Sequence, residues 1–196
     1  MCPDEPKNKE QEPVNSQSPS QNKGEASKEI GDTQASIAKA AAEKLDEKIS
    51  FEEAKEIWKQ IPAVMVVDDE VAILRAMKRV FKIYVADRNS IVTFSAPEEA
   101  LAHVEQLPAH SLIFCDNSMG SPMQGVDLAQ EIARVAAEKQ LIFILHTSDN
   151  SDYFEKQLKK GLSEGWIDGY VAKPATTHEA LETCAMAAKR KLPEKS

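Results

Sequence analysis

The stretch LIFCDNSMG (residues 112–120) carries the pattern from which the fold can be predicted. Its first four residues are apolar, which is typical of a β-strand buried on both faces, and the strand ends at a carboxylate, Asp116. An earlier stretch, AVMVVDDE (residues 63–70), has the same form and ends in the pair Asp68 and Asp69. Two buried strands that both end in carboxylates predict one acidic pocket at a common edge of a sheet.

The sequence around these two stretches predicts an alternation of strands and helices from Pro62 onward. Apolar runs predict strands at residues 63–67, 91–94, 112–115, 141–146 and 169–172. Apolar residues at helical spacing predict helices at about 70–84, 95–107, 126–139, 151–162 and 176–192. This alternation is typical of an α/β fold in which a five-stranded parallel sheet is doubly wound, with helices on both faces. In such sheets the functional crevice lies outside the carboxyl ends of the strands, where the Asp residues are expected.

Three helix starts carry the pattern of a capping box, in which a Ser or Thr is followed three residues later by Glu. The hydroxyl accepts a hydrogen bond from the Glu amide, and the Glu carboxylate bonds back to the amide of the capping residue. The predicted boxes are Ser50 with Glu53, Ser95 with Glu98, and Thr176 with Glu179.

The N-terminal part of the chain differs in composition from the rest. Residues 1–29 contain no Leu, Ile, Phe, Tyr or Trp, so they cannot bury enough apolar area to offset the entropy of ordering, and we predict a disordered tail over 1–31. Residues 32–61 are expected to form a helical extension, with one helix at about 33–48 and a second, apolar on one side, that Pro62 ends.

Composition excludes several classes of protein. The chain has 196 residues and a net charge of −8, which argues against a general role on nucleic acids or on membrane surfaces. No apolar run is long enough to span a bilayer, and the N-terminus lacks the apolar segment of a signal peptide. The three cysteines, Cys2, Cys115 and Cys184, have no metal-binding spacing and predict free thiols in the cytoplasm.

The acidic pocket predicts a particular chemistry. Two unit charges about 4 Å apart repel by roughly 4 kcal/mol at an effective dielectric constant of about 20, so a cluster of three carboxylates requires a cation or the protonation of one group. Oxygen ligands in an open crevice suit Mg²⁺, which favours carboxylates together with phosphate oxygens. Two further strand ends supply a hydroxyl, Thr147, and an ammonium, Lys173. Because a carboxylate can itself accept a phosphoryl group, the set predicts phosphoryl transfer.

The sequence resembles one family in the segments VVDDE, LIFCD, ILHTS and GYVAKP. Together, at this spacing, they are similar to the receiver domain of two-component response regulators, which has the CheY-like, flavodoxin-like fold, over about residues 62–192. CheY is also a standard example of the strand order 2-1-3-4-5, so the resemblance rather than the sequence pattern supplies that order.

The resemblance implies a role for each matching residue. Asp116 resembles the phosphoacceptor, and Asp68 and Asp69, with the backbone carbonyl of Ser118, resemble the ligands of Mg²⁺. Thr147 and Lys173 resemble the side chains that contact the phosphoryl group. Tyr170 takes the place of the aromatic residue that changes rotamer with Thr147 on activation, and the peptide bond between Lys173 and Pro174 is expected to be cis.

The sequence departs from the family in the loop after the acceptor. The usual pattern is D-x-x-M-P-x-x-x-G, whereas this chain has DNSMGSPMQG at residues 116–125. Met119 is in place, Gly120 replaces the proline, and Gly125 comes one residue late, so we expect a longer and looser loop.

The sequence therefore predicts a response regulator, not an enzyme, with a single receiver domain and no DNA-binding effector, since only four residues follow Leu192. The expected partners are a sensor histidine kinase or histidine phosphotransfer protein, and a downstream protein on the face of the fourth helix, fifth strand and fifth helix of the domain.

Three alternatives stay open from the sequence. The first is a pseudo-receiver that acts as a docking module without phosphorylation. The second is a phosphatase of the haloacid-dehalogenase type, which has a second Asp two residues after its nucleophile; here that residue is Ser118. The third is that residues 1–61 form the output and bind another protein.

Overall fold

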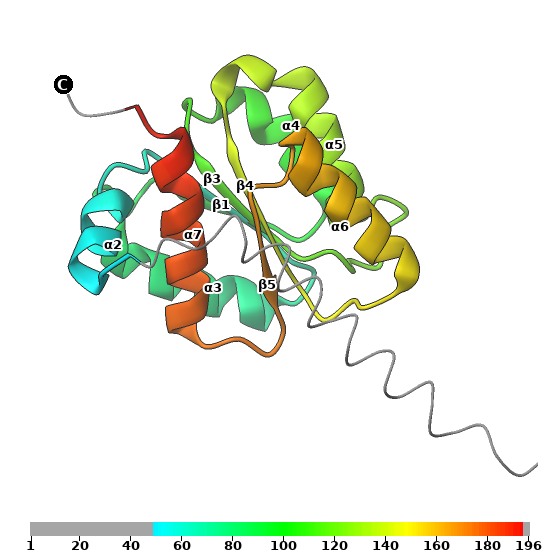
Figure 1. Cartoon of the computed structure of the whole chain (residues 1–196), viewed down its shortest axis with the longest axis horizontal. Coiled ribbons are helices and arrows are strands. Elements are labelled where there is room, and N and C mark those ends of the chain that lie inside the picture. The colour runs from blue at the N-terminus through cyan, green and yellow to red at the C-terminus, as the bar shows by residue number, and fades with distance from the viewer. Residues whose placement is uncertain (1–48, 194–196) are drawn as a thin grey trace, which may run out of the picture.

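The computed structural model describes residues 49–193, and its centre is a five-stranded parallel sheet. The strands are β1 (Val64–Val67), β2 (Ile91–Phe94), β3 (Leu112–Cys115), β4 (Ile142–Thr147) and β5 (Gly169–Ala172). Their order is β2-β1-β3-β4-β5, and every neighbouring pair is parallel. The predicted doubly wound α/β fold is confirmed (Figure 1).

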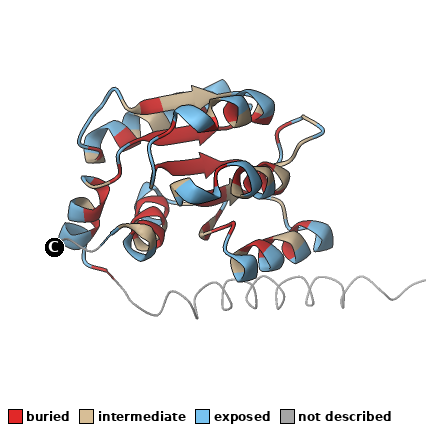
Figure 2. Ribbon diagram, turned by 90° about the horizontal axis from the view of Figure 1, so that it is seen from above, coloured by how far each residue is buried: buried red, intermediate tan, exposed pale blue. Residues whose placement is uncertain are grey.

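Helices cover both faces of the sheet. The helices are α2 (Phe51–Trp58), α3 (Val71–Tyr84), α4 (Pro97–His103), α5 (Gly125–Val135), α6 (Asp152–Glu164) and α7 (Thr177–Lys191). Helices α4, α5 and α6 pack with one core cluster, and α2, α3 and α7 pack with the other. Figure 2 shows the buried strands between these two layers.

The alternation of side chains along each strand explains why the strands are apolar throughout. On β1, Val64 and Val66 enter the core under α2, α3 and α7, while Met65 and Val67 enter the core under α4, α5 and α6. The register pairs Val67 with Cys115, the last residues of β1 and β3. The residues that follow these two strands, Asp68 and Asp116, are therefore placed side by side.

The three predicted capping boxes have different outcomes. The box of Thr176 with Glu179 is confirmed in both of its hydrogen bonds at the start of α7. At the start of α2, the Ser50 hydroxyl accepts from the Glu53 amide as expected, while the Glu53 carboxylate forms an ion pair with Lys189 at 3.0 Å.

The box predicted at Ser95 is wrong. Helix α4 begins at Pro97, because proline is favoured in the first turn of a helix, where its missing N–H costs no hydrogen bond. The Glu98 carboxylate accepts instead from the hydroxyl of Ser121, at 2.6 Å. A box that was not predicted, Gln124 with Asp127, begins α5.

The structure changes one predicted helix and does not describe the residues of another. The helix predicted at 126–139 is interrupted, because α5 ends at Val135 and Ala136 leaves the helical conformation before a short 3-10 turn at Ala137–Lys139. The predictions for residues 1–31 and for a helix at 33–48 lie outside the described residues.

Helix α2 is joined to the core of the sheet by Trp58. This side chain is 1% exposed, stacks on Phe81 with ring centroids 5.2 Å apart, and donates a hydrogen bond from Nε1 to the Leu181 carbonyl at 3.1 Å. The helix predicted at residues 50–61 therefore completes the apolar layer over α3 and α7.

Replacing Trp58 by Ala should lower the free energy of unfolding by about 3–5 kcal/mol, since the change leaves a cavity and removes a buried hydrogen bond. Urea unfolding of the full chain measures the loss. The matched control is Tyr153→Ala, which removes an aromatic side chain that is 59% exposed and should cost at most about 0.5 kcal/mol. Equal losses in the two variants would contradict the packing role of α2.

One polar side chain, His146 on β4, lies in the layer of α3 and α7. Its ring centroid is 4.9 Å from that of Phe114, and within the described chain its Nδ1 is buried without a hydrogen-bond partner. Burial, with a contribution from the charge of Lys173, lowers the pKa of His146 to about 4. The unfolded chain therefore binds more protons than the folded protein between about pH 6.5 and pH 4, and acid weakens the fold there.

Replacing His146 by Phe should reduce this acid sensitivity. Between pH 7 and pH 5 the wild type should lose on the order of 1 kcal/mol more stability than the variant, because only the wild type has the imidazole to protonate. Urea unfolding at the two pH values gives the difference. Parallel losses in both proteins would show that His146 does not contribute.

Candidate functional site

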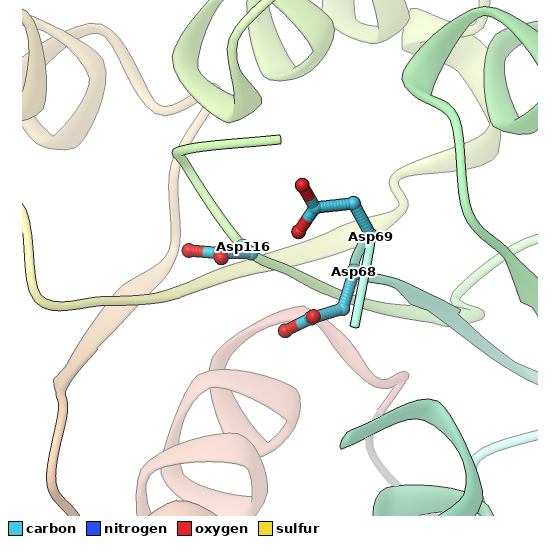
Figure 3. A group of neighbouring side chains, drawn as sticks. All are labelled: Asp68, Asp69 and Asp116. Carbon is cyan, nitrogen blue, oxygen red and sulfur yellow. The ribbon is translucent and has the colours of Figure 1, made fainter. Parts of the chain in front are cut away.

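Three carboxylates meet at the carboxyl ends of β1 and β3. Asp68, Asp69 and Asp116 each offer an oxygen, and these atoms lie within 4.8 Å of one another. In Figure 3 the three side chains extend from the two strand ends toward the same space. Asp68 and Asp116 are buried, at 2% and 6% exposed, and Asp69 is exposed, so the cluster opens to solvent on one side. The sequence prediction that these residues meet is confirmed.

Lys173 joins the two buried carboxylates. Its Nζ lies 3.2 Å from Oδ2 of Asp68 and 3.0 Å from Oδ2 of Asp116. The residue follows β5 directly, and its backbone N–H donates to the carbonyl of Thr147 at 2.9 Å, which fixes the base of the side chain beside β4. The bond from Lys173 to Pro174 is cis, as expected.

The negative charges of the carboxylate cluster exceed the positive charge of Lys173. Burial raises the pKa of Asp68; the Glu70 amide and Lys173 lower it in part, and the charge of Asp116 raises it further. Burial alone would lower the pKa of Lys173, but the Asp116 and Asp68 carboxylates outweigh this effect and raise it. The two buried carboxylates therefore share one ammonium, and Asp69 adds a third negative charge.

Backbone amides hold the other oxygens of the buried carboxylates. Oδ1 of Asp116 accepts from the amide of Asn117 at 2.7 Å and from that of Ser118 at 3.4 Å. Oδ1 of Asp68 accepts from the Glu70 amide at 2.9 Å. These bonds hold the two carboxylates with their Oδ2 atoms toward Lys173.

The donor set fits a hard divalent cation. Carboxylate oxygens from Asp68, Asp69 and Asp116 are grouped at one point, and the cluster carries more negative charge than Lys173 compensates. Ions such as Mg²⁺ take oxygen ligands and keep several waters, which an exposed side of the cluster allows. Ser118, whose carbonyl is the predicted further ligand, is exposed, and its amide lies 3.4 Å from Oδ1 of Asp116.

Two glycines determine the course of the unusual loop after Asp116. A Cβ on Gly125 would lie 2.3 Å from the Asp116 carbonyl oxygen, so α5 can start this close to β3 only with glycine. Gly120 has φ +53°, which proline cannot adopt, and a Cβ there would lie 3.5 Å from Oδ2 of Asp69. The extra residue is therefore absorbed between Gly120, which lies near the Asp69 carboxylate, and Gly125, which lies against the backbone of Asp116.

The longer loop is also anchored by hydrogen bonds. The hydroxyl of Ser121 donates to the Glu98 carboxylate on α4 and accepts from the Met123 amide at 3.2 Å. Met119, which the family pattern shares, is 3% exposed and belongs to the core under α4, α5 and α6.

Thr147 and Tyr170 lie beside the carboxylate cluster rather than in it. Thr147 is 1% exposed at the end of β4, and its Oγ1 accepts from the Asp149 amide at 3.1 Å. Tyr170 on β5 is half-buried, with its ring centroid 5.8 Å from that of Phe154 on α6. The structure thus places both predicted switch residues near the start of α6.

The sequence reasoning missed Asn117. The residue is 3% exposed. Its side chain donates from Nδ2 to Oδ2 of Asp149 at 2.9 Å and accepts at Oδ1 from the Val126 amide at 3.1 Å. An Asn two positions after the end of a buried strand, ahead of a helix without a Ser or Thr cap, is the one signal that could have marked it.

Within residues 49–193 no helix is long and apolar enough to cross a membrane. Comparison with curated proteins finds no match. Among solved structures the chain is similar to a response regulator receiver domain protein from Clostridium thermocellum, with 22% identity, a TM-score of 0.55, and coverage of 66% of this chain and 95% of that one.

Two other solved structures show the same fold. The chemotaxis protein CheY4 of Vibrio cholerae is 21% identical, with a TM-score of 0.52, covering 67% of this chain and 99% of that one. A structure described as adenylate cyclase from Rhodopirellula baltica is 18% identical, with a TM-score of 0.57, covering 67% of this chain and 90% of that one. At this identity the likeness concerns the fold alone.

A family model supplies the stronger comparison. The model described as "Response regulator receiver domain" matches residues 64–185, which is more than half of the chain. This range runs from the first residue of β1 into α7 and contains all of the site residues described above. The chain therefore belongs to the response regulator receiver family.

Proposed function

We propose that this chain is a phosphoacceptor receiver of a two-component phosphorelay, in which Asp116 accepts a phosphoryl group from the phosphohistidine of a kinase or phosphotransfer protein. The observation that carries the proposal is the Lys173 ammonium, which lies 3.0 Å from Asp116 and 3.2 Å from Asp68 at the open end of the sheet. A cation in this position can neutralise charge on transferring phosphoryl oxygens.

Mg²⁺ is the proposed cofactor of this site. Asp68, Asp69, Asp116 and the Ser118 carbonyl would hold the ion, and the oxygen donors gathered within 4.8 Å support that assignment. When bound, Mg²⁺ supplies positive charge that offsets the repulsion between the acceptor carboxylate and the phosphoryl oxygens.

The residues of the chain then have distinct roles in the transfer. A carboxylate oxygen of Asp116 forms a bond to phosphorus while the bond from phosphorus to the histidine nitrogen breaks, and the histidine keeps the electron pair. Lys173 neutralises the charge of the phosphoryl oxygens. The amides of Asn117 and Ser118, which already bind Oδ1 of Asp116, keep the acceptor in one orientation.

The signal would leave the pocket through Thr147 and Tyr170. A phosphoryl group on Asp116 offers the Thr147 hydroxyl a charge-assisted hydrogen bond, which is stronger than a neutral one. If Thr147 moves inward, Tyr170 can take the space it leaves, and the equilibrium between two packings of α6, β5 and α7 shifts. A downstream protein that binds this face would respond to the change.

This proposal places the chain in the cytoplasm, where it would act as a signalling protein rather than as an enzyme on a separate substrate. A pseudo-receiver that docks without phosphorylation is less well supported, because the lysine and all three carboxylates are present and close together.

Incubation with acetyl phosphate and Mg²⁺ should add one phosphoryl group to the wild type and none to Asp116→Asn, because the amide lacks a nucleophilic carboxylate oxygen. Intact-protein mass spectrometry measures the adduct. The matched control is Asp87→Asn, an exposed residue that lies between α3 and β2, away from the cluster, and it should be labelled like the wild type. An adduct that persists in Asp116→Asn, or no adduct on the wild type, would contradict the proposal.

A further inference from the structure

A partly buried hydrogen bond links the acceptor loop to the loop between β4 and α6. Asn117, the neighbour of Asp116, donates from its side-chain Nδ2 to Oδ2 of Asp149 at 2.9 Å. Its Oδ1 accepts from the amide of Val126 in the first turn of α5, so the side chain is held at both ends. Asn117 and Asp149 are 32 positions apart in the sequence, and neither residue belongs to one of the two hydrophobic core clusters.

Asp149 continues this link to α6. Its Oδ1 accepts from the Ser151 amide at 2.9 Å, and its own amide donates to Oγ1 of Thr147 at 3.1 Å. Ser151 is the N-cap of α6 and accepts from the amide of Phe154, whose ring lies against Tyr170. A continuous set of contacts thus runs from the acceptor loop to the start of α6.

The charge of Asp149 makes this link sensitive to charge in the pocket. Within the described residues its carboxylate is bound by two N–H groups, from Asn117 and Ser151, and the ion pairs of the site go to other carboxylates. Burial raises the pKa of Tyr170, and the charge of Asp149 contributes further, which places that charge within reach of β5. Phosphorylation would replace the single negative charge of the Asp116 carboxylate by a charge of about −1.5 to −2, so the pocket beside Asn117 would gain up to about one further negative charge.

We propose that Asn117 is a positioning residue that holds Asp149, and with it the start of α6, in the resting position, and that phosphorylation of Asp116 opposes this hydrogen bond. The positioning role of Asn117 does not depend on the proposed function, whereas the effect of phosphorylation rests on it. The repulsion between the phosphoryl group and Asp149 weakens the bond to Asn117, the Asp149 amide shifts with Thr147, and the N-cap of α6 is released from the acceptor loop. The link thus acts together with Thr147 and Tyr170 on the same face.

The first half can be tested in the unphosphorylated protein, without divalent cations, by NMR of the amides of residues 152–164 and of the Tyr170 ring. Asn117→Asp keeps an acceptor for the Val126 amide but turns a carboxylate toward Asp149, and Asn117→Ser shortens the side chain without adding charge. Both variants should shift these signals in the same direction. The expected change in the ratio of the two packings is roughly tenfold, the order expected for loss of one charge-assisted hydrogen bond.

Restoring the bond with exchanged partners provides the decisive control. In the double variant Asn117→Asp with Asp149→Asn, the new amide at position 149 can donate to the new carboxylate at position 117, and the net charge equals that of the wild type. Its signals should return toward the wild-type positions. Resting spectra of Asn117→Asp and Asn117→Ser that match the wild type, or a double variant no closer to the wild type than Asn117→Asp, would overturn the positioning role.

The second half is tested by adding Mg²⁺ and beryllofluoride, a stable mimic of the phosphoryl group. In the wild type the signals of α6 should move in the same direction as the shift expected for Asn117→Ser. In Asp149→Asn, which keeps an acceptor for Asn117 but removes the charge, the movement should be several-fold smaller. Equal movement in both proteins would contradict the repulsion. No binding of beryllofluoride at all would count against the proposed function instead, and the resting spectra would still decide the role of Asn117.

Discussion

The ion pairs of Lys173 with Asp68 and Asp116 are the interaction on which the account of this protein depends. Two carboxylates buried at 2% and 6% exposure would repel strongly without a cation, and one ammonium lies within 3.2 Å of both. That ammonium is shared, and Asp69 adds a third carboxylate, so the pocket keeps an excess of negative charge. A site of this kind would be stabilised by a further cation, which is the basis for proposing Mg²⁺ there.

The fold serves this pocket by bringing strand ends together. Because β1 and β3 are adjacent, parallel and in register at Val67 and Cys115, the residue after each strand reaches the same edge. Lys173 comes from the end of β5 and is tied through its amide to Thr147 at the end of β4. The two apolar layers, including α2 through Trp58, pack on both faces of the strands that carry these groups.

Much of this arrangement could be predicted from the sequence, and the exceptions have physical reasons. Apolar runs predict strands buried on both faces, as in a parallel sheet, and the Asp residues that follow such strands fall at the carboxyl edge of that sheet. The cap predicted at Ser95 was wrong because the Ser-x-x-Glu spacing was followed, whereas Pro97, which the sequence shows and which is favoured in the first turn, begins the helix. The bond between Asn117 and Asp149 was missed because side-chain contacts 32 residues apart have no periodic signal.

The central claim, that the three carboxylates form a cation site, is tested most directly by thermal unfolding with and without millimolar Mg²⁺. An ion that binds only the folded protein stabilises it by about 2.7 kcal/mol at 100 times its dissociation constant, so the midpoint should rise by several degrees. Asp69→Asn should lose this rise, and be no less stable than the wild type without metal, because Asp69 is exposed and adds only repulsion there. A wild type that does not respond to Mg²⁺, or an equal rise in Asp69→Asn, would contradict the claim.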